Sequence, residues 1–324
     1  MFSKKHGEDI KNIKMTRNRF GQTSKKDNSI RNILILFVIG FCFLIAIGIL
    51  FIPTMEITSE NKADDTVTEK AEHHREWTIP SLGMQLVYVE TGSFQMGAND
   101  GSKDYVPEHK VTISRGYWIG KYEVTKREYH SVMSWVNLGF ASRNKPVEDV
   151  SWNDAMKFCK KLTERERKAG RLPPAYEYRL PTEAEWEFAA RGGNKSKSYT
   201  YSGSNNINDV ACYYKNSHNN TFDVGTKAPN ELGIHDMSGN LLEWSLDHCN
   251  WNSKIITSTY KDGIVDPFER AGPYRINRNG SWGHYAKYCK VTRHGIMSPE
   301  TKTSDMGFRV VLAHNLNVHA AGLK

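Results

Sequence analysis

Residues 275–309 read RINRNGSWGHYAKYCKVTRHGIMSPETKTSDMGFR, and the rest of the chain is organised around this closing segment. Gly280-Ser-Trp282 stands near its start, and Gly307-Phe-Arg309 ends it. The apolar residues between these motifs are scattered, so the segment cannot supply a core, and other parts of the chain must hold its backbone. Supported loops of this kind commonly carry binding or catalytic residues. The closing segment is therefore the prime candidate for function.

The distribution of charge argues against one class of function. The 324 residues include 44 Lys/Arg and 36 Asp/Glu, which gives a net charge of +8 at pH 7. Nine of these basic and three of these acidic residues lie within residues 1–32, which leaves 35 and 33 in the remainder. The surplus belongs to the N-terminal tail and not to the folded part, so we do not expect nucleic acid as a partner.

Residues 33–52, ILILFVIGFCFLIAIGILFI, form an apolar run without a charge. As a helix, the run spans about 30 Å, the hydrocarbon thickness of a bilayer. A cleaved signal peptide is the alternative, but its apolar region usually extends for about 7–15 residues and ends at a small-x-small site. This run is longer and continues into Pro53-Thr-Met-Glu56. We therefore predict one transmembrane helix over residues 33–53, which makes the membrane a partner through residues 33–52.

Basic residues gather on the N-terminal side of this run, and the positive-inside rule places that side in the cytoplasm. Residues 1–32 then form a basic cytoplasmic tail. Residues 54–77 are polar and charged, which is typical of a linker. We expect a single-pass membrane protein, with its folded part in the periplasm of a bacterial inner membrane or in the extracellular space.

The remainder is predicted to form one α+β domain over residues 78–313, followed by a short tail over 314–324. Alternating apolar residues predict strands over 85–90 and 94–97. Gly92-Ser93 between them is expected to turn the chain, so that the two strands form a hairpin. Two more short strands are expected over residues 111–114 and 117–122.

Helix-start signals stand at three places. Helices are predicted to begin near Thr125, after Ser151 and after Thr182, and the last two sites have a carboxylate three residues later that completes a capping box. Residues 193–230 show neither helical nor strand periodicity. The sequence therefore predicts few helices, many short strands and long loops.

Seven motifs follow one another along this domain. They are Gly92-Ser-Phe-Gln-Met-Gly97, Glu123-Val-Thr125, Pro146-Val-x-x-Val-Ser-Trp152, Arg179-Leu-Pro-Thr-Glu-Ala-Glu-Trp186 with Ala189-Ala-Arg-Gly-Gly193, Leu232-Gly-Ile-His-Asp-Met-Ser-Gly-Asn-Leu-Leu-Glu-Trp244, Gly280-Ser-Trp282 and Gly307-Phe-Arg309. Together they resemble the formylglycine-generating-enzyme, or sulfatase-modifying-factor, family. The resemblance implies a single irregular α+β fold related to C-type lectins, with the closing segment as its exposed site. The family includes both oxidases and non-enzymatic binding proteins, so membership alone assigns no activity.

The resemblance also places a copper site in the closing segment. The oxidases of the family bind copper through two cysteines, three and eight residues after the serine of the Gly-Ser-aromatic motif. Counted from Ser281, the second position holds Cys289, but the first holds His284. Two soft thiolates select and hold Cu(I), so we disfavour copper here, although a His–Cys site is conceivable. The alternative is a Cys289 that is packed in the core or joined in a disulfide, with His284 as an exposed polar residue.

A calcium site is implied by the same resemblance. Its ligands would be the carboxylates of Asp236 and Glu243 and the main-chain carbonyls of Gly239 and Leu241. Calcium takes several oxygen ligands and accepts irregular backbone as their source. The alternative is that Asp236 caps a turn and Glu243 forms an ion pair. We expect calcium, which would fix a loop with little core of its own.

The leading hypothesis is a binding module whose loop 283–299 recognises a protein or a glycan. Polar and aromatic residues that suit such recognition lie along this loop: Tyr285, Lys287, Tyr288, Arg293 and His294. Tyrosine offers rigid, amphipathic contact area at low cost in conformational entropy. The alternative is an oxidoreductase that acts on a cysteine or another substrate through Cys289, with Ser281 and His284 as the other catalytic residues.

Overall fold

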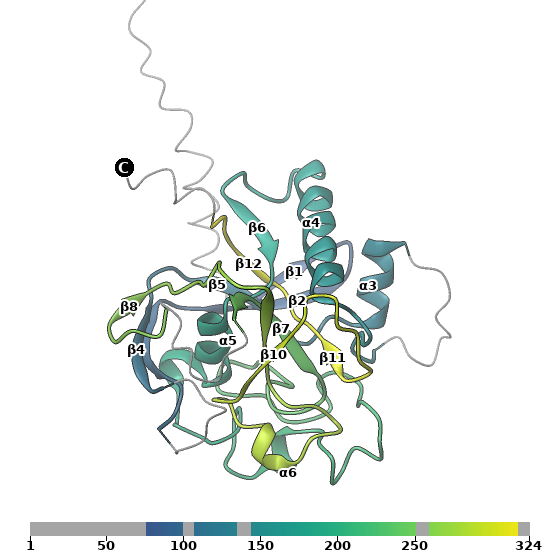
Figure 1. Ribbon diagram of the computed structural model, residues 1–324. Helices are drawn as coiled ribbons and strands as arrows, with labels where there is room; N and C mark the ends of the chain where they lie inside the picture. The colour runs from purple at the N-terminus through teal and green to yellow at the C-terminus, as the bar shows by residue number, and fades with distance from the viewer. Residues whose placement is uncertain (1–75, 100–106, 135–143, 251–258, 317–324) are drawn as a thin grey trace, which may run out of the picture. The chain divides into compact units, whose positions relative to one another are not determined.

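In the computed structural model, shown in Figure 1, the closing segment contributes strands to one sheet and ends directly before a strand of another. The structure describes residues 76–99, 107–134, 144–250 and 259–316. The predicted cytoplasmic tail, the predicted transmembrane helix over 33–53 and nearly all of the predicted linker lie outside these ranges. Within the ranges that the structure describes, no helix is both long and apolar enough to cross a membrane.

A five-stranded antiparallel sheet joins the two ends of the domain. Its strand order is β1-β2-β5-β12-β6. These strands are β1 (Glu76–Ile79), β2 (Met84–Val89), β5 (Tyr117–Gly120), β6 (Tyr176–Arg179) and β12 (Val311–His314). Because β12 lies between β5 and β6, the last strand of the domain is fixed on both edges, and so is the end of the closing segment.

A four-stranded sheet holds the rest of the closing segment. Its order is β10-β9-β7-β11, and β11 runs parallel to β7. These strands are β7 (Leu242–Cys249), β9 (Tyr274–Arg278), β10 (His294–Met297) and β11 (Met306–Gly307). The loop between β9 and β10 is therefore anchored by a strand at each end.

A three-stranded sheet corrects one prediction. It contains β3 (Gly92–Met96), β4 (His109–Ile113) and β8 (Ile264–Val265) in the order β3-β4-β8. The predicted hairpin between residues 85–90 and 94–97 is wrong, because β2 pairs with β1 and β5 whereas β3 pairs with β4. Gly92 and Ser93 are paired residues of β3 and not a turn.

The three predicted helix starts are confirmed. The helices are α3 (Lys126–Met133), α4 (Trp152–Lys168) and α5 (Glu183–Ala190), with Thr125, Ser151 and Thr182 as their N-caps. Each N-cap forms a capping box with the carboxylate three residues later, which satisfies backbone N–H groups that the first turn leaves free. The other helical turns among the described residues are η3 (Gly193–Lys195), α6 (Ile207–Val210) and η4 (Ala286–Tyr288).

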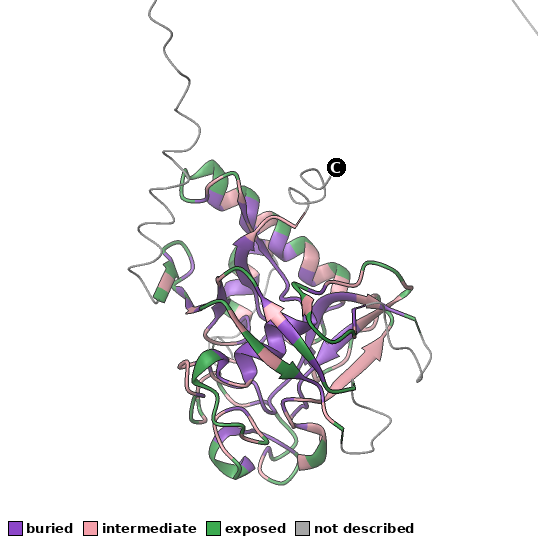
Figure 2. Cartoon of the chain, turned by 90° about the vertical axis from the view of Figure 1, so that its left-hand side faces the viewer, coloured by how far each residue is buried: buried purple, intermediate pink, exposed green. Residues whose placement is uncertain are grey.

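Two hydrophobic clusters form on opposite faces of the five-stranded sheet. Successive strand residues enter different clusters, as Leu86 and Val87 do, because side chains alternate across a strand. Helices α3 and α4 contribute to the first cluster, and α5 contributes to the second. Figure 2 shows buried residues at the centre of the domain and exposed ones along its outer loops. This mixture of few helices, many strands and long loops confirms the α+β prediction.

Candidate functional site

The candidate site lies where the loop after β9 crosses the loop before β7. The N–H of Trp282 donates to the carbonyl of Asn240 at 2.8 Å, and the hydroxyl of Ser238 donates to the carbonyl of Cys289 at 2.9 Å. The N–H of Tyr214 donates to the carbonyl of His284 at 2.9 Å, which adds a third segment. The closing segment is therefore held by backbone contacts to other loops, as its lack of a core predicted.

Cys289 lies beneath this surface and not on it. Its side chain is fully buried beside Ile207, Ala211 and Tyr213, and burial raises the pKa of its thiol to about 12. A Cβ added at Gly280 would lie 2.6 Å from the sulfur, so only glycine lets the Gly-Ser turn pass this close. At neutral pH the thiol is protonated and out of reach of a substrate.

Ser281, which is buried, forms a polar turn with the half-buried His284 and Asp305. The hydroxyl of Ser281 lies 3.0 Å from Nδ1 of His284 and donates to Oδ2 of Asp305 at 2.9 Å. The backbone N–H of Ser281 also donates to Nδ1 of His284 at 3.1 Å, so this nitrogen acts as an acceptor. Burial lowers the pKa of His284 and favours its neutral form. Ser281 is fully buried, so these contacts hold the turn and present no nucleophile to solvent.

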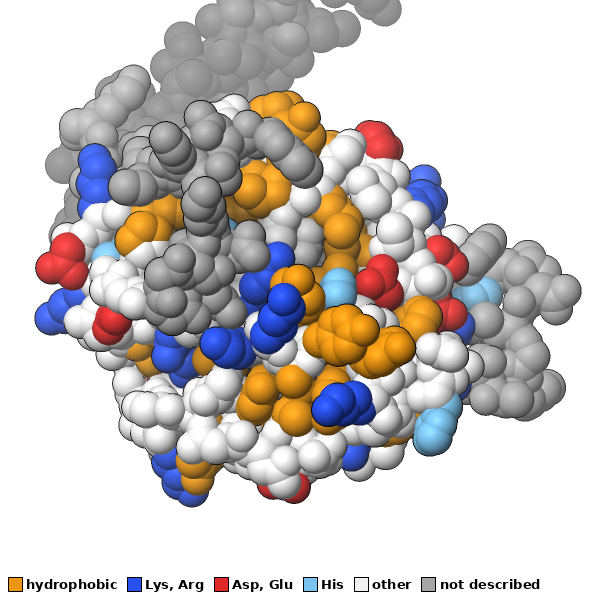
Figure 3. All heavy atoms as spheres, turned by 60° about the horizontal axis from the view of Figure 1, so that its bottom comes forward, with side chains coloured by type: hydrophobic (Ala, Val, Ile, Leu, Met, Phe, Trp, Pro, Cys, Tyr) orange, Lys and Arg blue, Asp and Glu red, His pale blue; other side chains and the backbone are white. Residues whose placement is uncertain are grey.

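A cluster of exposed or half-buried aromatic and basic side chains covers the turn, and we call it the tyrosine surface: Tyr214, Tyr285, Lys287, Tyr288 and Arg293. The ring centroids of Tyr214 and Tyr285 are 4.7 Å apart, and the two side chains are 49% and 54% exposed. Lys287 and Arg293 lie over the ring of Tyr288 at 4.7 and 5.6 Å. Figure 3 brings this end of the molecule forward and shows hydrophobic side chains with basic ones around them.

Tyr214 was missed by sequence reasoning. It lies in the irregular stretch 193–230, about 70 residues before its partner Tyr285, and no spacing rule connects the two. Only the structure identifies Tyr214 as a candidate binding residue, because it shows that the side chain is exposed. Within the described part of the chain, the exposed large hydrophobic residues are Tyr214, Val265 and Tyr285.

His294 does not join the tyrosine surface. Its Nδ1 donates to Oε1 of Glu183 at 2.9 Å, and the same carboxylate accepts hydrogen bonds from Arg278 and Tyr260. Burial alone would raise the pKa of Glu183, but His294, Arg278 and Tyr260 outweigh it and lower the pKa to about 2. The structure therefore separates His294 from the other four predicted ligand-binding residues.

Replacing His294 by alanine is expected to lower the free energy of unfolding at pH 7 by about 1–3 kcal/mol, because a buried carboxylate loses a donor. The depressed pKa of Glu183 stabilises the fold above about pH 4.5, and this contribution is lost as the pH falls towards 2. In the variant the loss should begin at a higher pH. Denaturant midpoints between pH 3 and 7 measure both effects, with Lys287→Ala as the control. If the denaturant midpoints of the two variants changed with pH in the same way, His294 would not be the residue that stabilises the Glu183 carboxylate.

The residues of the expected calcium site do not fit the ion as they are arranged. Both oxygens of Glu243 accept hydrogen bonds from Arg309 at 2.7 Å, and Oε2 also accepts from the indole of Trp186. Oδ2 of Asp236 accepts from the N–H of Gly225 at 2.7 Å, and burial raises the pKa of Asp236 to about 6.

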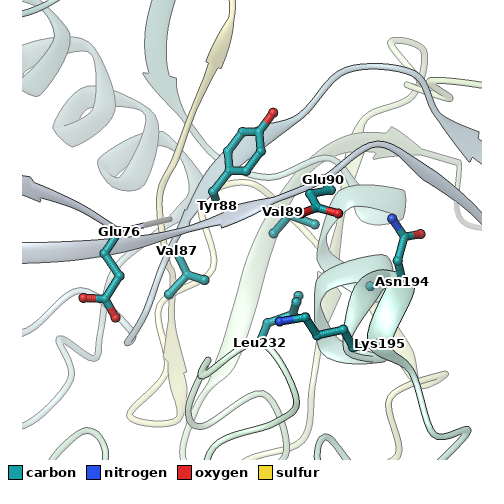
Figure 4. A pocket seen from close by; sticks show the side chains of 9 residues that line it. Glu76, Val87, Tyr88, Val89, Glu90, Asn194, Lys195 and Leu232 are labelled. Atoms are coloured by element: carbon teal, nitrogen blue, oxygen red, sulfur yellow. The ribbon is translucent and has the colours of Figure 1, made fainter. Parts of the chain in front are cut away.

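Two clefts lie beside other parts of the fold. One, of about 230 Å³, is lined by β2, η3 and Leu232, and Lys195 reaches towards Leu232 in Figure 4. The other, of about 590 Å³, is polar and includes Arg191, Tyr199 and Lys290. None of the predicted site residues lines either cleft. Neither of these two clefts therefore belongs to the candidate site.

The fold and the site together define an irregular α+β domain that presents an aromatic and basic surface on a loop. The chain belongs to the family of the sulfatase-modifying factor enzyme 1-like domain, whose profile matches residues 80–314. This match confirms the family prediction.

Three similar proteins show the range of the family. Chaperone protein LppX of Paenibacillus barcinonensis is 33% identical over 272 aligned residues, which cover 70% of this chain and 88% of that protein. The formylglycine-generating enzyme of Mus musculus is 29% identical over 192 residues, but the match covers 53% of this chain and 45% of the enzyme. Treponema denticola variable protein 1 has a TM-score of 0.62 and 30% identity, and covers 73% of this chain and 97% of its own.

Proposed function

We propose that this chain is a binding module whose tyrosine surface contacts a segment of another protein. The observation that carries the proposal is the packing of two strongly exposed tyrosines, Tyr214 and Tyr285, next to a third tyrosine flanked by Lys287 and Arg293. Exposed aromatic side chains are among the residues that most often dominate binding energy at protein interfaces. The two cations favour a partner with carboxylates beside apolar groups.

The relative from Paenibacillus barcinonensis supports a protein partner over a glycan, because it is named a chaperone and its match covers most of both chains. As part of the proposal, residues 33–52 anchor the chain in a membrane and hold the domain outside the cytoplasm. A partner of the tyrosine surface would then lie on that side of the membrane.

The alternative, an oxidoreductase acting through Cys289, has less support. Its thiol is buried and its raised pKa keeps it protonated, whereas nucleophilic and copper-binding cysteines act as thiolates. Nδ1 of His284, at the first copper-cysteine position, already accepts a hydrogen bond from the backbone N–H of Ser281 and lies 3.0 Å from the hydroxyl of the same residue. A substrate would have to displace these packed groups before reaching the sulfur.

Photocrosslinking tests the proposal. A benzophenone amino acid placed at Tyr285 in the full-length chain, expressed in its own cells, is expected to give a discrete adduct that contains a second polypeptide. The same amino acid at Val265 is the matched control, because both side chains are 54% exposed and Val265 lies on β8. Equal adducts at both positions would contradict the proposal, and so would an adduct at Tyr285 that contains glycan or lipid and no polypeptide.

A further inference from the structure

Asn279 directly follows β9, and its side chain contacts the loop over residues 236–243, where the family resemblance places calcium. Its side-chain nitrogen lies 2.9, 2.7 and 3.0 Å from the carbonyl oxygens of Asp236, Gly239 and Leu241, and its two N–H groups are shared among these three acceptors. Two of these three carbonyls, those of Gly239 and Leu241, are expected calcium ligands. One amide nitrogen therefore occupies the point on which the loop's carbonyl oxygens converge.

The other end of the same amide fixes the neighbouring backbone. The side-chain oxygen of Asn279 accepts from the N–H groups of Gly239 and Gly280, both at 2.8 Å. Asn279 is 2% exposed, and its φ of 72° lies in the left-handed region that non-glycine residues rarely adopt. Such a backbone conformation persists where surrounding contacts determine it, and here five hydrogen bonds to one side chain do so.

A cation bound in this loop would make two kinds of contact, and in this structure a side chain makes each of them. The first satisfies converging carbonyl oxygens, and the N–H groups of Asn279 make it. The second stabilises the buried carboxylates of Asp236 and Glu243: that of Asp236 accepts a hydrogen bond from the N–H of Gly225 at 2.7 Å, and that of Glu243 requires a cation. The guanidinium of Arg309 supplies this positive charge through two hydrogen bonds of 2.7 Å, and the side chains of Arg309 and Glu243 are both fully buried. A calcium ion needs six to eight oxygen ligands, and here the nitrogen of Asn279 occupies its place.

We propose that Asn279 and Arg309 together replace the calcium ion in this chain, so that the loop over residues 236–243 is ordered without metal. The side-chain amide supplies the donors and the guanidinium supplies the positive charge. Asn279 also begins an Asn-Gly-Ser sequence that matches a glycosylation acceptor, but its amide is buried and fully engaged. This inference stands whether or not the tyrosine surface binds a protein.

The first test uses the unmodified full-length protein in detergent. Its melting temperature is expected to be the same after excess EDTA and after excess calcium chloride, and elemental analysis of the purified protein should find no stoichiometric calcium. One calcium ion per chain, or a melting temperature that falls with EDTA and recovers with calcium, would overturn the proposal.

The second test replaces Asn279 by glycine, which keeps the left-handed backbone and removes the amide. Three buried carbonyls lose their donors, so the melting temperature should fall by about 5–10 °C. Asn219→Gly is the matched control, because Asn219 also has a left-handed φ, of 59°, and its side chain is exposed. Equal melting temperatures for the two variants would refute the role of Asn279. If Asn279→Gly fails to fold while Asn219→Gly folds, the side chain is required, as proposed.

Discussion

Replacing Arg309 by methionine is expected to lower the free energy of unfolding by about 3–5 kcal/mol, the usual effect of removing one partner from a buried ion pair. Arg309 is fully buried and makes a two-point contact with Glu243. Its guanidinium also donates to the carbonyls of Gly120 and His235, at 2.9 and 3.0 Å. Methionine fills part of the volume but leaves a buried carboxylate and two carbonyls without these donors.

Chemical denaturation followed by tryptophan fluorescence measures this effect. Lys302→Ala is the control, because Lys302 is paired with Asp154 at 2.6 Å but its side chain is 54% exposed. Solvent screens such a pair, and its loss should cost at most about 1 kcal/mol. If the two substitutions had similar effects, Arg309 would not be the residue that neutralises Glu243, and the proposal that it stands in for a cation would fail with it.

The second large effect is expected on binding. Replacing Tyr285 by alanine should weaken binding of the crosslinked partner roughly tenfold to hundredfold, as truncation of an aromatic residue at the centre of an interface commonly does. Tyr214→Ala should have a similar effect, because the two rings pack against each other. The double variant should lose less than the sum of the two, since each ring supports the other.

Titration of the partner against each variant measures these losses. Val265→Ala is the control, because Val265 is as exposed as Tyr285 but lies on β8. This substitution should leave the affinity unchanged. Full additivity of Tyr214→Ala and Tyr285→Ala would show that the rings act separately. Unchanged affinity in both single variants would move the binding site away from the tyrosine surface.

Local chemistry explains which parts of the fold could be predicted. The capping boxes at Ser151 and Thr182 depend on a residue and its neighbour three positions later, so the sequence contains the whole interaction. The predicted hairpin at Gly92 was wrong because strand pairing depends on residues that are far apart in the sequence. Strand β3 pairs with β4, and β2 pairs with β1 and β5. The alternation of apolar and polar residues identified the strands, but it could not identify which strands pair with one another.

The sequence by itself determined the family, the helix starts and the positions of His284 and Cys289, because motifs and spacings are properties of a linear chain. Only the tertiary structure decided that Cys289 is buried, that His294 pairs with Glu183 and that Tyr214 joins Tyr285. It also decided that the side-chain amide of Asn279 contacts the carbonyls of Asp236, Gly239 and Leu241. The physical reason is that burial and hydrogen-bond partners are set by contacts between segments 38 to 111 residues apart, which no local pattern records.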